Sequence, residues 1–357
     1  MNSQENIKKI DNPFNLSQIL IPVVIGIIVV LWLFLAEFDP DTLLNVKFTW
    51  VSVGYILLAF MLMVGRDFGM IWRFRLMSDK FLTWRQSFSV HILSEFTSAV
   101  TPSAVGGSGL VVLFLNKEGI SVGRSTAMMF ASLLMDELFF IVICPLIFLF
   151  VPMSDLFNAT SVVTSTIGVV FWTIYGVLFC WTLILYVSLF HRPDLIAKLI
   201  QLVFKLPMLR KWHSKISVFG NSIIESSNEI SKKPISFWLK IFGATVLTWS
   251  SRFLVVNALF MAFAPVQNHL IIFGRQILLW IVMVVSPTPG GSGLSEYAFK
   301  EYYNDIALGN GPVLIITVIW RLVSYYLYLL LGAIVIPRWI SGKFKRHKTS
   351  NVSKLHF

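Results

Sequence analysis

Two copies of one short stretch decide how this chain folds: Gly106-Gly107-Ser108-Gly109-Leu110 and Gly290-Gly291-Ser292-Gly293-Leu294. The second copy starts 184 positions after the first, about half of the 357 residues. Prolines precede both copies, and each copy lies within an apolar stretch, Phe88–Leu115 or Leu270–Leu294. Glycine permits sharp backbone bends and proline breaks helices. Each copy therefore predicts a turn that joins two apolar helical limbs.

The composition is that of a protein embedded in a membrane. Hydrophobic residues make up 56% and aromatic residues 15%, whereas charged residues make up only 13%. Soluble domains carry about 25% charged residues. These values exclude a cytosolic enzyme, a disordered regulator and a disulfide-rich secreted module. The only cysteines, Cys144 and Cys180, lie in apolar runs, so we expect neither a disulfide framework nor a metal site.

Six apolar runs are long enough, or nearly so, to cross a bilayer, for which about 20 residues are needed. The six predicted spans are Leu20–Ala36, Trp50–Val64, Thr126–Phe150, Val162–Phe190, Phe237–Ala264 and Pro312–Ile336. Charged residues precede the first run and an acidic loop follows it, which is not the pattern of a cleavable signal peptide. We therefore count the first run as a span.

The charges of the connecting segments predict the orientation. Residues 66–85 carry a net charge of +3 and residues 191–240 a net charge of +6, and the tail after Ile336 has six basic residues and no acid. The loop at 37–49 is acidic instead. Basic loops stay on the cytoplasmic side. We predict a multi-pass protein of the bacterial inner (plasma) membrane with cytoplasmic N- and C-termini.

The two glycine-containing stretches must then turn back inside the membrane. If each crossed once, the basic residues 191–240 would lie outside. The charge bias holds if Phe88–Leu115 enters and leaves from the cytoplasm and Leu270–Leu294 from the outside. The predicted fold is an all-α integral membrane protein with about six transmembrane helices and two re-entrant helical hairpins.

The order of spans and hairpins is the same in both halves, and the loop charges give the halves opposite orientations. This is the inverted repeat of secondary transporters. The predicted domain is a single membrane domain, 1–357, with a first repeat half at 20–150, a second at 162–190 and 237–336, a cytoplasmic basic amphipathic linker at 191–235, and a basic cytoplasmic tail at 337–357.

The two turns are the predicted substrate-binding elements. Unwound backbone at membrane depth must be buried in protein or line a polar cavity, and a helix that starts after a turn offers free N–H groups to an anion. The alternative is that glycine and serine only let helices pack closely. The candidate residues are Gly106, Gly107, Ser108, Gly109, Pro289, Gly290, Gly291, Ser292 and Gly293.

Seven ionisable residues lie at predicted membrane depth, where charge is costly without a function. The set divides by sign: the first half holds His91, Glu95, Asp136 and Glu137, and the second half holds Arg252, Arg275 and Arg321. The arginines are candidate ligands of an anionic head group, because guanidinium matches phosphate oxygens. Alternatively, Asp136 or Glu137 pairs with Arg321 or Arg252 and holds the halves together.

His91 and Glu95 lie one helical turn apart. They form either a proton-coupled pair or an ordinary polar contact.

No motif predicts catalysis, a cofactor or nucleic-acid binding. The chain lacks a Walker loop, a zinc-protease motif and a nucleophile elbow. Leucines at helical spacing between lysines in 191–235 are typical of an amphipathic helix on an anionic lipid surface. A nucleic-acid-binding protein would need a packed soluble module. We expect membrane lipids with anionic head groups as partners.

The second turn and a later span resemble a known family. Pro289-Gly290-Gly291-Ser292-Gly293-Leu294-Ser295-Glu296 is similar to the Pro-Gly-Gly-x-Gly-x-x-Glu turn of the membrane domain of lysylphosphatidylglycerol synthases, the flippase-like domain family. Trp320-Arg321-Leu322-Val323-Ser324-Tyr325-Tyr326 resembles the Arg-Leu-x-[Ser/Thr]-Tyr-Tyr span of that family. The residues from Thr101 to Gly109 and from Lys117 to Ser121 are similar as well.

The resemblance implies that the chain moves a lipid between leaflets, such as an aminoacylated or other anionic phospholipid, and it adds Glu296 to the candidate site. The synthases carry a further soluble aminoacyl-transferase domain, so we expect no such enzyme activity here. Two alternatives stay open. One is a secondary transporter of a small soluble anion, and the other is a membrane-embedded transferase acting on a lipid precursor.

Overall fold

The chain is an all-helical integral membrane protein. In the computed structural model the described part of the chain contains helices and turns but no strand. Five described helices are long and apolar enough to cross a membrane: Trp50–Met77, Val122–Phe150, Ile167–Phe190, Ile235–Phe263 and Pro312–Ile336. The described residues are 48–101, 104–157, 162–192, 194–195, 213–284, 286, 288, 290–291, 293–306, 310–336 and 339.

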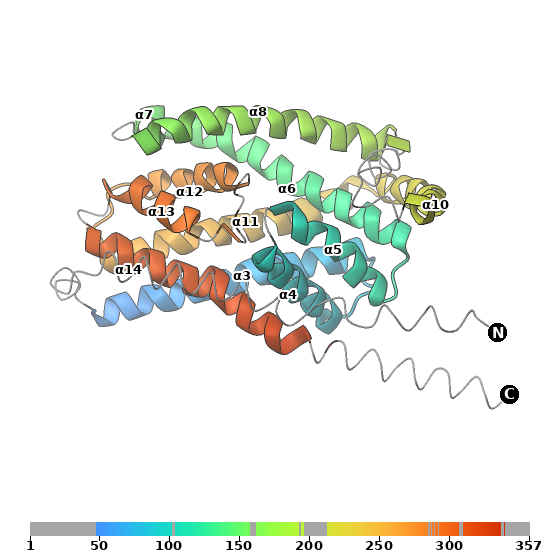
Figure 1. Ribbon diagram of the computed structural model, residues 1–357, viewed down its shortest axis with the longest axis horizontal. Coiled ribbons are helices and arrows are strands. Elements are labelled where there is room, and N and C mark those ends of the chain that lie inside the picture. The colour runs from blue at the N-terminus through green and yellow to red at the C-terminus, as the bar shows by residue number, and fades with distance from the viewer. Residues whose placement is uncertain are drawn as a thin grey trace.

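The long helices lie side by side along the longest axis of the molecule, and two pairs of shorter helices lie between them (Figure 1). The first half contains α3 (Trp50–Met77), α4 (Trp84–Val100), α5 (Ala104–Lys117), α6 (Val122–Phe150) and the short α7 (Met153–Leu156). The second half contains α8 (Val162–Phe190), α10 (His213–Ser231), α11 (Ile235–Phe263), α12 (His269–Met283), α13 (Leu294–Tyr303), α14 (Asn310–Arg321) and the π-helical turn η3 (Leu322–Tyr326), after which the helix continues to Ile336.

The predicted spans coincide with these helices in five of six cases, and the sixth, Leu20–Ala36, lies outside the described residues. One predicted loop is wrong. We ended the span of α3 at Val64 because Arg66 follows it, and we assigned 66–85 to the cytoplasm. Instead α3 continues to Met77, because its charged residues are neutralised by partners on neighbouring helices.

Local sequence signals explain where the helices start and stop. The hydroxyl of Thr49 accepts a hydrogen bond from Ser52 N at 3.2 Å, and Thr83 and Ser121 cap α4 and α6 in the same way. Side-chain caps of this kind satisfy N–H groups that have no partner within the helix. Pro234 is the N-cap of α11, where its missing N–H removes no hydrogen bond within the helix.

The most extensive helix pairing joins α3 to α11, and the two helices run antiparallel. Ser52 near the start of α3 donates to the carbonyl oxygen of Ala262 near the end of α11 at 2.8 Å. Gly69 near the other end of α3 lies against Thr248 and the backbone of Ala244. In the predicted inverted repeat α3 and α11 are equivalent spans, and such spans should run antiparallel. The repeat itself stays a prediction.

Replacing Gly69 by alanine should destabilise this helix pair. The new Cβ would contact Thr248 Oγ1 and lie 2.9 Å from the carbonyl oxygen of Ala244, so α3 and α11 would have to move apart. We expect a loss of about 1–3 kcal/mol, typical of overpacking, measured by chemical unfolding in detergent. Gly54 on the same helix is the matched control, because nothing lies within 4 Å of a Cβ there. Equal effects of both substitutions would contradict the close approach.

The first hairpin consists of α4 and α5, which pack against each other. Gln86 in the first turn of α4 donates to Glu118, directly after α5, at 2.9 Å, so the hairpin starts and ends at the same end of the bundle. The glycine stretch does not form the turn as predicted. Helix α4 ends at Val100, and Gly106 to Gly109 are part of α5 because a helix resumes at Ala104.

The second hairpin consists of α12 and α13. The Tyr303 hydroxyl at the end of α13 donates to the carbonyl oxygen of Ile272 near the start of α12 at 3.1 Å. This hairpin extends to Tyr303, beyond the predicted limit at Leu294, because the returning limb begins only after the glycines. The two hairpins enter from opposite ends of the bundle, and Figure 1 shows α12 and α13 at the left and α4 and α5 at the right.

The end of the bundle that we predicted to be cytoplasmic is held by exposed ion pairs. Asp79 binds Lys233 Nζ at 2.8 Å and Arg124 at 2.5 Å, and thereby ties the end of α3 to α6 and α11. In the linker, α10 packs on α6, and Gly123 lies directly against Ser222. The leucines from Leu199 onward that predicted an amphipathic helix lie outside the described residues.

The pKa of Asp79 is lowered below its ordinary value. Partial burial alone would raise it, but the hydrogen bonds and charges of Lys233 and Arg124 outweigh burial. A lowered pKa means that the carboxylate stabilises the fold above the pKa of the unfolded chain, about 3.9, and loses this effect as the pH falls through the lower folded value.

Asp79→Asn should therefore remove part of the acid-induced loss of stability, measured as thermal unfolding between neutral and strongly acid pH. Asparagine tolerates the left-handed backbone of residue 79, φ 52°, so the substitution changes the charge and not the turn. The pair is exposed, so added salt should weaken the effect. An identical acid transition in the variant would contradict the assignment.

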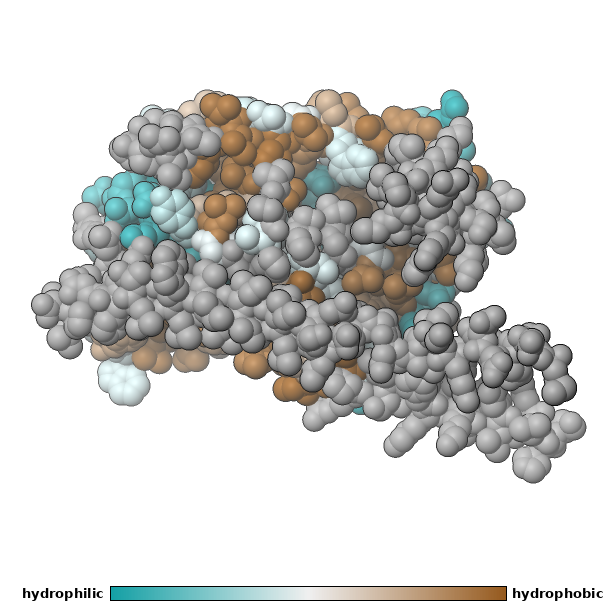
Figure 2. All heavy atoms as spheres, in the orientation of Figure 1, coloured by the Kyte–Doolittle hydropathy of each residue, from teal (hydrophilic) through white to brown (hydrophobic). Residues whose placement is uncertain are grey.

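The outward side of α8 is apolar. Side chains along α8 such as Val169, Val177 and Leu183 are exposed, and Figure 2 shows hydrophobic residues gathered along this upper edge of the molecule. An exposed apolar face this long is unfavourable in water and favourable against lipid chains. The charged residues discussed below lie in the interior instead.

Candidate functional site

The ends of the two hairpins meet in the interior. The hydroxyl of Tyr325 in η3 donates to the carbonyl oxygen of Ala99, next to the first turn, at 3.1 Å. A Cβ at Gly290 in the second turn would clash with the Tyr325 ring and lie 3.1 Å from the same carbonyl oxygen. Gly290 also has a φ of +56°, so both the backbone and the space require glycine there. The second turn therefore lies against the end of α4; binding of a substrate by the two turns stays a prediction.

A buried ion pair holds the second turn. Arg321 Nε lies 2.5 Å from Glu296 Oε1, and the other carboxylate oxygen accepts from Gly293 N at 2.7 Å. The guanidinium also reaches the carbonyl oxygen of Gly290 at 3.4 Å. Glu296 thus occupies the N-terminal end of α13, where a negative charge is favourable and where we expected an anionic ligand. Binding of a ligand by Arg321 and Glu296 stays a prediction.

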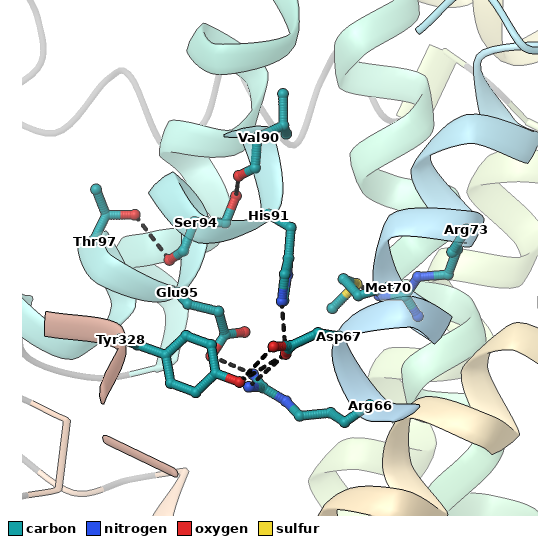
Figure 3. A network of polar contacts seen from close by, with 10 residues as sticks. All are labelled: Arg66, Asp67, Met70, Arg73, Val90, His91, Ser94, Glu95, Thr97 and Tyr328. Carbon is teal, nitrogen blue, oxygen red and sulfur yellow. Dashed lines mark hydrogen bonds and ion pairs between the residues drawn. The ribbon is translucent and has the colours of Figure 1, made fainter. Parts of the chain in front are cut away.

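A second network surrounds Asp67 on α3 (Figure 3). Its carboxylate accepts from the Tyr328 hydroxyl at 2.7 Å, from His91 Nε2 at 2.9 Å and from Arg66 at 3.2 Å. Arg66 also forms an ion pair with Glu95 and lies over the Tyr328 ring, 4.8 Å from its centroid. The network joins α3, the first hairpin and the last span. His91 and Glu95 do not contact one another as a pair; both contact residues of α3.

Arg252 on α11 lies beside this network and forms no ion pair with any carboxylate among the described residues. Its guanidinium carbon lies 4.1 Å from the centroid of the Trp280 ring and 5.7 Å from that of Trp249. Arg66 and Glu95 are within electrostatic range of it. The side chain of Arg252 is half-buried.

Arg275 has a different environment from Arg252. Its five N–H groups are all used: they donate to the carboxylate of Asp305 and to the carbonyl oxygens of Asp155 and Tyr302, over distances of 2.6–2.9 Å. These contacts fasten α12 to α13 and to the segment around α7. No donor of Arg275 is left for a ligand in this arrangement.

Asp136 and Glu137 on α6 also differ from each other. Asp136 binds Arg73 of α3 at 2.5 Å and accepts from Trp249 Nε1 at 2.8 Å. Glu137 is half-buried and makes no ion pair within the described chain. The predicted alternative, a pair with Arg321 or Arg252, is wrong, because Arg73 lies closer to α6. The predicted division of the buried charges, with carboxylates in the first half and arginines in the second, is also wrong, because buried Arg66 and Arg73 lie in the first half.

The structure does not describe every residue of the predicted site. Pro289 and Ser292 lie outside the described residues. The backbone of Gly106, Gly107 and Ser108 is helical, but the surroundings of these three residues lie outside what the structure describes. Gly109 is exposed, with nothing within 4 Å of a Cβ.

Sequence reasoning missed three members of the Asp67 network: Arg66, Asp67 and Tyr328. Arg66 and Asp67 were taken for loop residues. The signal that identifies them is the apolar run that resumes directly after them, from Phe68 to Phe74, since a helix interrupted by two adjacent opposite charges can still span a membrane. Tyr328 had no such signal, because its role depends on the packing of the last span.

Comparisons with known proteins agree with this architecture. A family model described as the lysylphosphatidylglycerol synthase TM region matches residues 19–332. A UPF0104 membrane protein of Archaeoglobus fulgidus is 27% identical over 307 residues, which cover 82% of this chain and 89% of that protein. No solved structure matches the chain. The family model extends over both hairpins.

Proposed function

Because the chain belongs to the family of the lysylphosphatidylglycerol synthase TM region, we propose that it moves an anionic or aminoacylated phospholipid, or a related lipid, between the two leaflets. The membrane is the bacterial inner membrane, with both termini in the cytoplasm. The phosphate of the head group binds inside the bundle, and the acyl chains stay in the surrounding lipid.

The observation that carries the proposal is the state of Arg252. A charged side chain inside a membrane bundle normally has a partner of opposite charge. Arg275 and Arg321 have protein partners, whereas Arg252 has two tryptophan rings and no carboxylate among the described residues. A phosphate oxygen pair would supply the hydrogen-bond acceptors that Arg252 lacks, because a guanidinium binds it through two parallel hydrogen bonds.

The hairpins provide a route to both leaflets. They enter the bundle from opposite ends, and Gly290 of the second turn lies against Ala99 at the end of α4 and against Tyr325 of the last span. If the two halves form an inverted repeat of re-entrant hairpins, rocking one half against the other exposes the same site to each leaflet in turn. The antiparallel pair of α3 and α11 supports this geometry.

The two alternatives use the same groups. A small soluble anion would also fit Arg252, and the family membership favours a lipid. A lipid transferase needs a general base, for which we named Glu95, Asp136, Glu137 and Glu296. Three of these carboxylates are already bound to arginines, which leaves Glu137 alone among the described candidates. Translocation therefore has more support than transfer.

The test is reconstitution of the full chain into liposomes that contain tail-labelled fluorescent phosphatidylglycerol or phosphatidylcholine. A membrane-impermeant reductant then bleaches the outer leaflet, and the remaining fluorescence reports the rate of movement. We expect phosphatidylglycerol to reach the outer leaflet faster than in protein-free liposomes, and faster than phosphatidylcholine.

A parallel set of liposomes loaded with inorganic phosphate tests the soluble-anion alternative, with phosphate release as the readout. Release of phosphate without movement of either lipid would replace our proposal by anion transport. Movement of neither lipid above the protein-free rate would refute lipid translocation.

A further inference from the structure

The network around Asp67 contains a histidine nitrogen without a partner. His91 has no exposed surface, and its Nδ1 makes no hydrogen bond within the described chain. The other ring nitrogen, Nε2, lies 2.9 Å from the Asp67 carboxylate. An ionised carboxylate only accepts hydrogen bonds, so Nε2 carries the proton and Nδ1 holds a free lone pair in the neutral ring. The free lone pair on Nδ1 can therefore accept one more proton.

The charges around this ring balance without a ligand. The charged and polar groups of its network are Arg66 and Asp67 on α3, Glu95 on its own helix α4 and the Tyr328 hydroxyl on the last span. Arg252 on α11 lies within electrostatic range of both carboxylates. Two guanidinium groups oppose two carboxylates, so the set is neutral while His91 is neutral. Net charge in an interior of low dielectric is costly.

A head group at Arg252 disturbs this balance. It adds one negative charge beside Glu95 and Asp67, and no further basic side chain among the described neighbours faces the network. A proton on His91 Nδ1 would restore neutrality, and the resulting imidazolium would keep its Nε2–H bond to Asp67. Histidine is suited to this exchange, because its ordinary pKa of about 6.5 is close to physiological pH.

We propose that one proton binds at His91 together with each anionic head group at Arg252, so that lipid movement is coupled to the proton gradient. The inference rests on the proposed function and adds the coupling ion to it. The proton gained on binding is released with the lipid on the other side. By linkage, protons strengthen binding of the anion to the same degree that the anion strengthens binding of the proton.

The test measures binding and not transport. Short-chain phosphatidylglycerol is titrated into the purified full chain in detergent, between about pH 6 and 8, by calorimetry in two buffers of different ionisation enthalpy. We expect uptake of about one proton per lipid, and an affinity that rises about tenfold for each pH unit of acidification over which one proton is taken up. Phosphatidylcholine, which has no net charge, should take up no proton.

His91→Gln should still bind phosphatidylglycerol but lose the proton uptake and the pH dependence. Asp67→Asn is the second variant, because it removes the counter-charge of the imidazolium and keeps a group of the same shape. His269→Gln is the matched control, since His269 is exposed at the start of α12 and should behave as the wild type.

The results separate the two proposals. Binding of phosphatidylglycerol by the wild type with no proton uptake overturns the coupling and leaves the lipid proposal standing. Proton uptake that persists in His91→Gln also overturns it, because another group then takes the proton. Absence of any phosphatidylglycerol binding refutes both. The wild-type measurement alone decides the case if the variants do not fold.

Discussion

Arg252→Gln is expected to slow phosphatidylglycerol movement in liposomes by about 10- to 100-fold, because one or two hydrogen bonds between charged groups are lost. The fold should change little. Arg252 forms no ion pair within the described chain, and its contacts with Trp249 and Trp280 contribute about 0.5–2 kcal/mol. The rate of bleaching by the impermeant reductant measures the effect.

Two further variants make the result specific. Arg252→Lys keeps the charge but loses the planar pair of donors, so its rate should fall between those of the wild type and the glutamine variant. Arg192→Gln removes an exposed arginine outside the site and should leave the rate unchanged. A wild-type rate in Arg252→Gln would show that the head group binds elsewhere.

The largest loss of stability is expected at the second turn. Glu296→Gln leaves the Arg321 guanidinium buried without a counter-ion, and Arg321→Met leaves the Glu296 carboxylate with only Gly293 N. Breaking one partner of a buried pair costs about 3–5 kcal/mol. The free energy of unfolding, followed by tryptophan fluorescence in detergent, should fall by this amount in either single variant.

The double variant, Glu296→Gln with Arg321→Met, should lose far less than the sum of the two single losses, because no uncompensated charge remains. A double-mutant cycle measures this coupling. Additive losses would mean that the two side chains do not act as a pair. If the stable double variant still moves phosphatidylglycerol, Arg321 and Glu296 serve the turn and do not bind the head group.

Much of the architecture could be predicted without tertiary structure. Hydropathy located five of the described spans, and most predicted span ends lie within a few residues of the helix ends. The reason is that crossing a membrane requires a long apolar helix whatever its neighbours are. Proline and glycine located both hairpins for a similar local reason. The exact turns were harder: Gly106 to Gly109 became part of α5, because glycine permits a bend but does not impose one.

Pairing between distant residues could not be predicted. The sequence placed Arg66 in a loop and joined Asp136 to the second half, and both were wrong because charge alone does not say which helix faces which. The sequence treated Arg252, Arg275 and Arg321 as equivalent. Their environments differ. Arg252 lies beside two tryptophans, Arg275 uses every N–H group in hydrogen bonds, and Arg321 forms a buried ion pair.

The sequence by itself determined that this chain is a helical membrane protein with two broken helices, because these properties depend on each segment and its solvent. The tertiary structure alone decided that the ends of the hairpins meet at Ala99 and Gly290, and that Arg252 lacks a carboxylate partner among the described residues. The physical reason is that the cost of a buried charge depends on neighbours that the chain brings together from positions far apart in sequence.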